Sequence, residues 1–227
     1  MKSQYAPTPA VRILISYEGT ATPDEINHYQ QKIGSINYTA ITTHPDVAKI
    51  ASHLATFMTN PGPQHFEATN QALACLNYTQ KVGIKYSAAP TELTSPSECF
   101  MTASDAAFGD HSDCHSSEGY LATLYGGPVD WRASKQKTVT TSSTKAELLA
   151  ISEAGKILQW WRCLFAAIGF DPEHHLAIKC DNMQTIHILC KNDPSIQTNY
   201  AMLIFISIGF VKKLSPNKFS LTGFQPR

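Results

Sequence analysis

The sequence of 227 residues lacks several features that would assign it directly to a class of protein. It has no run of about 18 apolar residues of the kind that a membrane helix needs. Its six cysteines form no Cys-x-x-Cys pair, so a structural zinc site is not indicated. Only 16% of its residues are charged, and 18 basic residues balance 18 acidic ones. A polyanionic partner would therefore need a local basic patch or bound metal ions.

The composition nevertheless provides enough apolar material for a packed core, because 43% of the residues are hydrophobic. No charged and then apolar leader stands at the N-terminus, and free thiols persist in a reducing compartment. We therefore expect an intracellular protein, cytoplasmic or nuclear, with no membrane association. The length fits one or two domains.

Helix signals dominate the first third of the chain. Thr-Pro-Asp-Glu at residues 22–25 combines an N-cap, a first-turn proline and a capping-box glutamate, which predicts a helix start. A second helix is predicted from His44, and Asn-Pro-Gly-Pro at residues 60–63 would end it. A third helix is expected over 64–78. We predict a small helical module over residues 1–87.

The pattern changes to strands near residue 82. A short strand is expected over 82–86, and a Pro/Ser/Thr-rich linker over 88–97. Beyond it, strands are predicted at residues 99–105, 119–125, 129–132, 139–141 and 176–180, and the second and third of these would form a hairpin. Helices are predicted at residues 144–170 and 183–191. This order favours an α/β domain over 98–227, a mixed sheet with flanking helices.

Three acidic residues stand where a folded domain disfavours charge. Asp105 ends an uncharged strand, and Asp181 directly follows a compact apolar strand. Glu147 lies four residues before Ile151 on the apolar stripe of the long helix. Carboxylates at the carboxyl ends of strands gather where ligands bind in α/β sheets. Divalent cations such as Mg²⁺ would relieve the repulsion among them.

Spacing alone leaves a second interpretation open for each of these residues. Residues 144–147 match a capping box, in which Glu147 would be only a helix cap. Asp105 also fits the start of a turn, and Asp181 with Asn182 fits the cap of the following helix.

A series of motifs sets these residues in a wider pattern. In order, the chain contains Ser-Asp-Ala at 104–106, Gly-Tyr at 119–120, Gly-Gly-Pro-Val-Asp-Trp at 126–131, Ser-Lys-Gln at 134–136, Ser-Ser-Thr-Lys-Ala-Glu at 142–147 and Cys-Asp-Asn at 180–182. This series closely resembles the RNase H domain of copia-type retrotransposon polyproteins. Residues 29–35 and 60–63 are similar to the segment that joins polymerase to RNase H in those polyproteins, a helical connection of the reverse transcriptase.

The resemblance implies an RNase H-like fold and a metal-dependent ribonuclease that cleaves the RNA strand of RNA–DNA hybrids. It implies that Asp105, Glu147 and Asp181 are catalytic and bind Mg²⁺, with Mn²⁺ as a substitute. Other parts of a retroelement polyprotein are implied partners.

Three basic residues near the predicted hairpin are candidates for nucleic-acid binding through phosphate contacts, with ordinary solvated charge as the alternative. They are Arg132, Lys135 and Lys137.

The chain departs from the family at two positions near its end. Tyr200 and Met202 stand where the family has a late histidine and a fourth aspartate. Methionine is a poor ligand for a hard cation, so a second metal ion would be held more loosely. The alternative function is therefore a catalytically inactive retroelement relict that at most binds nucleic acid or a partner. A third is a structural or dimerising module that uses Trp160, Trp161 and Phe165.

Overall fold

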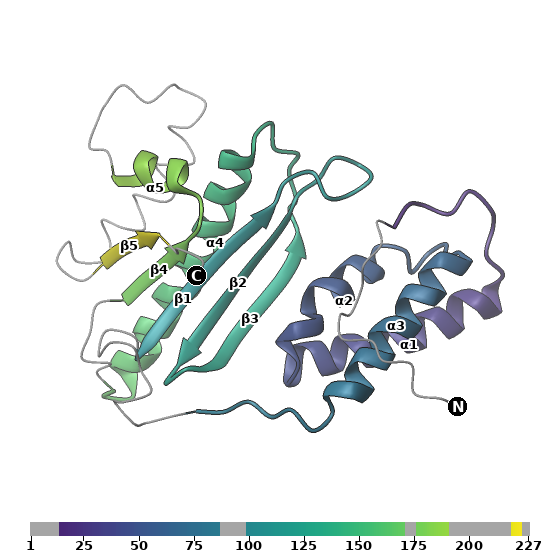
Figure 1. The fold of residues 1–227 in the computed structure, drawn as a ribbon, viewed down its shortest axis with the longest axis horizontal. Coiled ribbons are helices and arrows are strands. Elements are labelled where there is room, and N and C mark those ends of the chain that lie inside the picture. The colour runs from purple at the N-terminus through teal and green to yellow at the C-terminus, as the bar shows by residue number, and fades with distance from the viewer. Residues whose placement is uncertain (1–13, 87–98, 171–175, 191–218, 224–227) are drawn as a thin grey trace. The chain divides into compact units, whose positions relative to one another are not determined.

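The structure is a computed structural model that describes residues 14–86, 99–170, 176–190 and 219–223 (Figure 1). Its helices and strands are, in chain order, α1 (Pro23–Thr42), the 3₁₀ turn η1 (Pro45–Val47), α2 (Ala48–Ala55), α3 (Pro63–Thr79), β1 (Phe100–Ala107), β2 (Ser117–Leu124), β3 (Gly127–Lys135), α4 (Ser143–Ala167), β4 (Leu176–Cys180), α5 (Met183–Cys190) and β5 (Phe219–Gly223). Within the described ranges, no helix is both long enough and apolar enough to cross a membrane.

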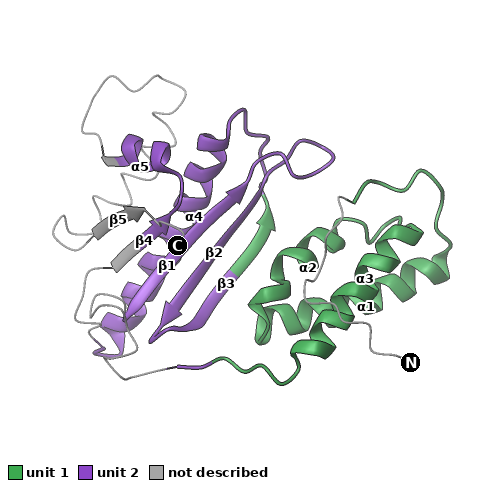
Figure 2. Cartoon of the chain, viewed as in Figure 1, with its two compact units in different colours: residues 1–84, 132–135 green, residues 85–131, 136–227 purple. Residues whose placement is uncertain are grey.

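The chain divides into two compact units, which Figure 2 colours separately. Unit 1 comprises residues 1–84 with 132–135, and unit 2 comprises residues 85–131 with 136–227. The linker expected over 88–97 lies outside the described residues.

Unit 1 is built from the three helices that the sequence predicts. Thr22 Oγ1 accepts a hydrogen bond from the backbone N–H of Glu25 at 3.3 Å, and Glu25 Oε2 accepts one from the backbone N–H of Thr22 at 2.8 Å. This reciprocal pair is the predicted capping box of α1. Pro63 takes the first position of α3, where its missing N–H costs nothing. The predicted helical module is thus present.

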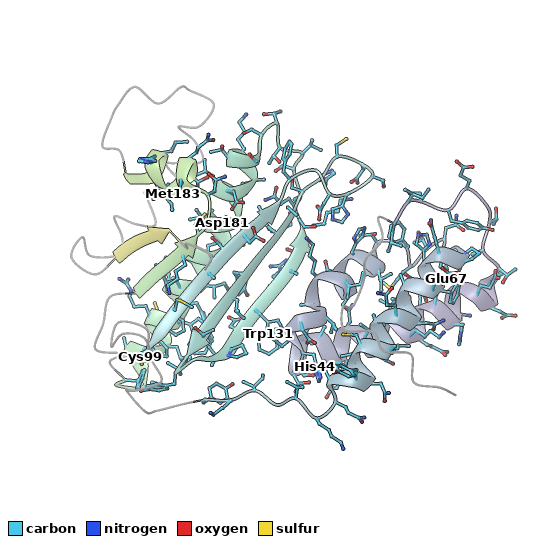
Figure 3. All side chains as sticks on the ribbon, viewed as in Figure 1. His44, Glu67, Cys99, Trp131, Asp181 and Met183 are labelled. Carbon is cyan, nitrogen blue, oxygen red and sulfur yellow. The ribbon has the colours of Figure 1, made fainter. Side chains whose placement is uncertain are left out.

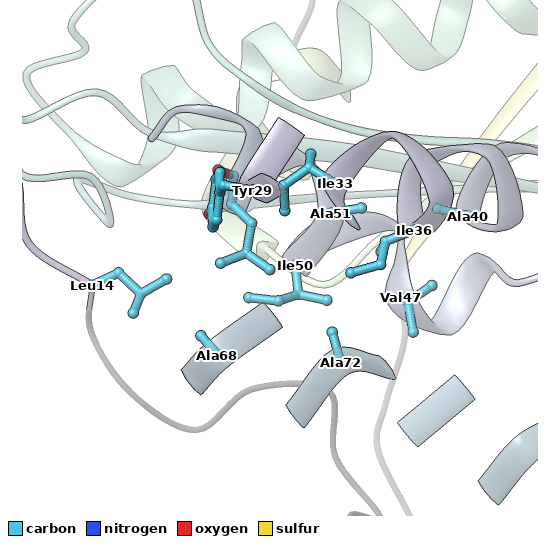
Figure 4. Close-up of a cluster of buried hydrophobic side chains, with 11 residues drawn as sticks. Leu14, Tyr29, Ile33, Ile36, Ala40, Val47, Ile50, Ala51, Ala68 and Ala72 are labelled. Atoms are coloured by element: carbon cyan, nitrogen blue, oxygen red, sulfur yellow. The ribbon is translucent and has the colours of Figure 1, made fainter. Parts of the chain in front are cut away.

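The apolar stripes of these helices meet in one core, shown in Figure 4. Its fully or almost fully buried members are Leu14, Tyr29, Ile33, Ile36, Ala40, Val47, Ile50, Ala51, Leu54, Ala68 and Ala72. The hydroxyl of Tyr29 donates to the carbonyl of Leu54 at 3.0 Å, so the phenol buries no unpaired polar atom.

Side chains from the start of α3 and the turn before it hold the segment that precedes α1. The Asn60 amide accepts from Ala21 N–H at 2.9 Å and donates to the carbonyls of Tyr17 and Gly19 at 3.1 and 2.8 Å. Nδ1 of His65 accepts a hydrogen bond from the backbone N–H of Gly62, and Nε2 of His65 lies within hydrogen-bond distance of the carbonyl of Ile15. We infer that His65 is neutral with its proton on Nε2, because Nδ1 is the acceptor.

The strands form one five-stranded mixed sheet in the order β3-β2-β1-β4-β5, which belongs to unit 2 except for residues 132–135 of β3. β1 runs antiparallel to β2 and parallel to β4, and β4 runs parallel to β5. Helix α4 covers one face, where alternate residues of β1 point into a shared core. The buried members of that core are Phe100, Ala122, Ile151, Ala154, Leu158, Phe165, Ile178 and Cys180. The predicted fold class, an α/β domain with a mixed sheet and flanking helices, is confirmed.

The predicted hairpin joins β2 to β3, but its tight turn lies at residues 125–126 and not at the expected 126–128. Tyr125 and Gly126 both have positive φ values, 49° and 77°. A two-residue hairpin turn of type I′ requires this conformation at both positions, and it matches the twist of the flanking strands. Glycine adopts it freely, whereas Tyr125 does so at some cost in backbone strain.

Three strand predictions differ from the structure. Residues 82–86 and 139–141 form no strand in the described chain, because neither segment pairs with a neighbouring strand. The 139–141 stretch instead leads into the N-cap of α4. β5 was not predicted, although the alternation of apolar and polar residues over 219–223 is typical of a half-buried strand.

Candidate active site

Two of the three candidate carboxylates occupy neighbouring positions on β1 and β4. Asp105 lies near the carboxyl end of β1, and Asp181, labelled in Figure 3, follows the last residue of β4. The parallel register pairs Ala103 with Lys179. Continuing it by two residues would bring Asp105 opposite Asp181, which lies one residue beyond the end of β4. The two carboxylates therefore share one end of the sheet.

The third carboxylate comes from α4 and is buried. Only 5% of the surface of Glu147 is exposed. Burial, the largest cause, and the negative charges of Asp105 and Asp181 raise the pKa of Glu147 to about 7. Hydrogen bonds from the backbone N–H of Ala106 and from the Cys180 thiol act in the opposite direction. A nearby cation would favour the ionised form of such a group.

The start of α4 excludes the interpretation of Glu147 as a helix cap. The N-cap is Ser142, whose Oγ accepts from the backbone N–H of Lys145 at 3.3 Å. The helix therefore begins two residues earlier than a capping box at residues 144–147 requires. Glu147 is the fifth helical residue, and its carboxylate bonds to Ala106 on β1. The side chain of Glu147 therefore contacts the end of the sheet and does not cap the helix.

The alternative roles of the two aspartates are also taken by other features. Asn182 Oδ1 accepts from the N–H of Thr185 at 3.0 Å, so Asn182 caps α5 and the Asp181 carboxylate does not. Asp105 lies inside β1, paired with Gly119 of β2, and starts no turn. Both aspartate side chains are exposed.

A cysteine that the sequence left without a role belongs to the same cluster. Cys180 Sγ lies 3.9 Å from Glu147 Oε2. Burial, followed by nearby acidic groups, raises the pKa of the Cys180 thiol to about 11, although a backbone hydrogen bond from Asn182 lowers it. Its position directly before Asp181 was the available signal.

Polar contacts fix the first turn of α4 against its surroundings. The buried Gln136 side chain donates through Nε2 to the carbonyl of Ala146 at 2.9 Å and to Glu118 Oε2 at 3.2 Å. The Thr144 hydroxyl donates to Gln184 Oε1 at 3.3 Å, which links α4 to α5. These contacts hold the helix turn that carries Glu147. The bonded residues are 10 to 40 positions apart in the sequence, so no local pattern indicates these contacts.

Two groups of predicted residues are not placed at the carboxylates. Arg132 and Lys135 lie three positions apart on β3, so strand alternation directs them to opposite faces. Lys137 is exposed just after that strand. β3 is an outer strand, and β2 and β1 separate it from β4. Tyr200 and Met202 lie outside the described residues.

The donor chemistry of the cluster fits a divalent cation. In the described part of the chain, Glu147, Cys180 and Asp181 form a group whose ligand atoms all lie within 4.8 Å of one another. Asp105 is close enough for its charge to raise the pKa of both Glu147 and Cys180. The exposed aspartates leave the cluster open to solvent on one side. Carboxylate oxygens with room for water are the arrangement that Mg²⁺ prefers.

Comparisons with known proteins place the chain in a wider context. No protein-family model matches it. The Retrovirus-related Pol polyprotein from transposon RE1 of Arabidopsis thaliana is 31% identical over 188 residues, which is 82% of this chain and 12% of that polyprotein. Secreted RxLR effector protein 161 of Plasmopara viticola is 37% identical over 133 residues, or 58% of this chain and 89% of the effector.

Among solved structures, LC11-RNase H1, isolated from compost by a metagenomic approach, superposes with a TM-score of 0.44 at 12% identity, covering 56% of this chain and 84% of that one. The transposon relatives are much longer than this chain, which spans about 12% of the length of each of the three plant polyproteins it matches. The chain belongs to the family of retrovirus-related Pol polyproteins of copia-type retrotransposons and corresponds to one segment of them.

Proposed function

We propose that the chain is a metal-dependent ribonuclease that cleaves the RNA strand of RNA–DNA hybrids. The observation that carries this proposal is the placement of the Glu147 carboxyl group, whose burial, together with the charges of two neighbouring carboxylates, raises its pKa to about 7. Such a cluster destabilises a fold unless cations compensate it, and groups with this perturbation are typical of catalytic sites.

Asp105, Glu147 and Asp181 would hold the cations, with Mg²⁺ as the natural ion and Mn²⁺ as a substitute. Bound divalent cations supply Lewis acidity, which makes a water molecule more acidic and stabilises the leaving oxygen in phosphodiester hydrolysis. The residues of the chain position this chemistry. The backbone N–H of Ala106 orients the Glu147 carboxylate, and the exposed aspartates face solvent, from which a phosphate group can approach.

The substrate class follows from the family to which the chain belongs. An RNA–DNA hybrid is recognised mainly through its shape, its phosphates and its 2′-hydroxyl groups, so no base-reading motif is required. Arg132, Lys135 and Lys137 are our candidates for phosphate contacts along β3, about two strands from the carboxylates. The alternative is a catalytically inactive relict, which the replacement of the family's fourth aspartate by Met202 favours.

The test is cleavage of a hybrid labelled on its RNA strand, with Mg²⁺ or Mn²⁺ present. We expect cleavage by the wild-type chain and a loss of about 100-fold or more in Asp105→Asn, the order seen when an electrostatic contribution to an active site is removed. Glu153→Gln is the matched control, because Glu153 lies on α4 and pairs with Lys156 away from the cluster. Absence of cleavage with both ions would establish the inactive relict.

A second substitution tests the role given to the altered C-terminal segment. Met202→Asp would restore the fourth carboxylate of the family, and we expect it to raise the cleavage rate several-fold because a second cation would be held more firmly. The same assay measures it, with Met183→Asp as a control at an exposed methionine near Asp181. An unchanged rate in Met202→Asp would show that residue 202 does not reach the site.

A further inference from the structure

The cluster at the end of β4 differs from a pure carboxylate site because one of its donors is sulfur. Cys180 Sγ lies 3.9 Å from Glu147 Oε2, and Asp181 completes a group within 4.8 Å. Zinc-to-sulfur and zinc-to-oxygen bonds of about 2.3 and 2.0 Å in tetrahedral geometry separate the two donor atoms by roughly 3.6 Å. The observed spacing therefore needs a shift of only a few tenths of an ångström to hold such an ion.

A second observation points into the same place. Ser104 is 6% exposed, and among the described residues its Oγ has no hydrogen-bond partner. The parallel register that pairs Thr102 with Ile178 brings Ser104 opposite Cys180 when it is continued by two residues. Residues paired across parallel strands point to the same face of a sheet, so the register places the unpaired Ser104 hydroxyl on the same buried face as the Cys180 thiol. Buried polar atoms are rarely left unsatisfied without an unseen partner.

We propose that Glu147, Cys180 and Asp181 form a site for a thiophilic divalent cation, Zn²⁺ or Cd²⁺, that competes with Mg²⁺ for the two carboxylates. This proposal deepens the proposed function, on which it rests for the identity of the competing ion. The preference comes from the donor set, because thiolate binds soft cations and contributes little to Mg²⁺.

Binding replaces the S–H bond of Cys180 with an S–metal bond, and the proton passes to solvent without any change in oxidation state. A coordinating cation deprotonates a thiol outright, so the protonated state of the free thiol does not prevent binding. The exposed Asp181 provides the route by which the ion enters, since Glu147 and Cys180 are both buried. Thiophilic ions would then inhibit the ribonuclease activity of this chain more strongly than that of enzymes whose metal sites contain only carboxylates.

Direct spectroscopy tests this without relying on cleavage. The parent protein for this test is the full chain with the substitutions Cys114→Ser, Cys163→Ser and Cys190→Ser. Co²⁺ is the probe, because its ligation by a thiolate gives a charge-transfer band in the near ultraviolet. We expect a band that saturates at a single ion per chain. Cys180→Ser should abolish it, Glu147→Gln should weaken Co²⁺ binding about tenfold, and excess Mg²⁺ should reduce it.

Each outcome separates the two proposals. No band in the parent protein, or a band that survives Cys180→Ser, overturns the sulfur-containing site. If circular dichroism shows that Cys180→Ser fails to fold, two other measurements test the site: competition of Mg²⁺ with Co²⁺, and Co²⁺ binding by Glu147→Gln. A Co²⁺ band that neither Mg²⁺ nor Glu147→Gln changes refutes the site. A band without hybrid cleavage keeps this inference and refutes the ribonuclease, and cleavage without a band does the reverse.

Discussion

Buried polar groups are treated differently in the two units. In unit 1, His65, Asn60 and Tyr29 bond to backbone groups, so their polar atoms have partners. In unit 2, the buried side-chain atoms of four residues have no partner in the described structure. They are Thr102 Oγ1, Ser104 Oγ, Gln136 Oε1 and Thr185 Oγ1, against His44 Nε2 alone in unit 1.

This difference separates a structural region from a candidate functional one. Satisfied buried groups stabilise a single packing, which is how Asn60 and His65 act on the segment before α1. Unsatisfied groups and repelling carboxylates reduce stability, and in the described chain the carboxylates that raise the pKa of Glu147 lie in unit 2, as do four of the five residues with unsatisfied atoms. We interpret unit 2 as a region that retains groups which lower its stability because they form a candidate binding site.

The largest expected effect is a fall in the stability of unit 2 as pH rises in the absence of metal ions. The pKa of Glu147 is about 7 in the folded chain and 4.5 ordinarily, so the folded state binds more protons between these values. The stabilisation is complete below pH 4.5 and lost above pH 7, by about 3 kcal/mol. Denaturant unfolding in EDTA followed by tryptophan fluorescence measures it, since all three tryptophans lie in unit 2.

Glu147→Gln should abolish this decrease and leave a more stable protein at pH 8, because no charge is then buried. The matched control Glu153→Gln should keep the pH dependence of the wild type. If Glu147→Gln retained the same fall with pH, the carboxyl group would have to be solvated in the folded chain.

Much of this contrast could be predicted from the sequence, but not all of it. The helix start at residues 22–25, with a polar cap and a proline in the first turn, is a local signal and was predicted correctly. The end-of-strand aspartates were also local signals. The burial of Glu147 against Cys180 was not, because it depends on the register of β1 with β4 and on the turn at which α4 begins.

The strands predicted over 82–86 and 139–141 are wrong for a related reason, whereas the predictions that correspond to β1 to β4 are confirmed. A strand exists only when a neighbour pairs with it, and periodicity in one segment says nothing about the other. Residues 139–141 have the β-branched composition of a strand, yet they lead into the cap Ser142. β5 has the alternation of a strand, but its pairing with β4 is what defines it, and the partner strand is not indicated by a local pattern.

A smaller effect of opposite sign is expected in unit 1. Burial lowers the pKa of His65, so the folded state binds fewer protons than the unfolded chain. Its contribution to stability is therefore present above pH 6.5 and lost as pH falls through the lowered value. His65→Leu should destabilise unit 1 by about 2 kcal/mol at pH 8, because the N–H of Gly62 and the carbonyl of Ile15 lose their partner.

Hydrogen exchange of the amides in α1 and α3 measures this loss separately from unit 2. The control is His28→Leu, because His28 is exposed and only stacks on Phe66. Equal protection in the two variants would mean that the bonds of His65 add nothing to stability.

The smallest effect compares the helix caps of the two units. Thr22→Ala and Ser142→Ala each remove one side-chain acceptor, and each should cost about 1 kcal/mol. Only the second should also weaken the stabilisation of the chain by Mg²⁺, because the cap at Ser142 sets the turn of α4 from which Glu147 projects. Thermal unfolding with and without Mg²⁺ measures both quantities.

Ser142→Asp should restore stability and Mg²⁺ response together, since aspartate caps helices as well as serine does. A Mg²⁺ response lost equally in Thr22→Ala would contradict the assignment of the cation site to unit 2, and a response unchanged in Ser142→Ala would show that Glu147 is held by the sheet through Ala106 and not by the start of its helix.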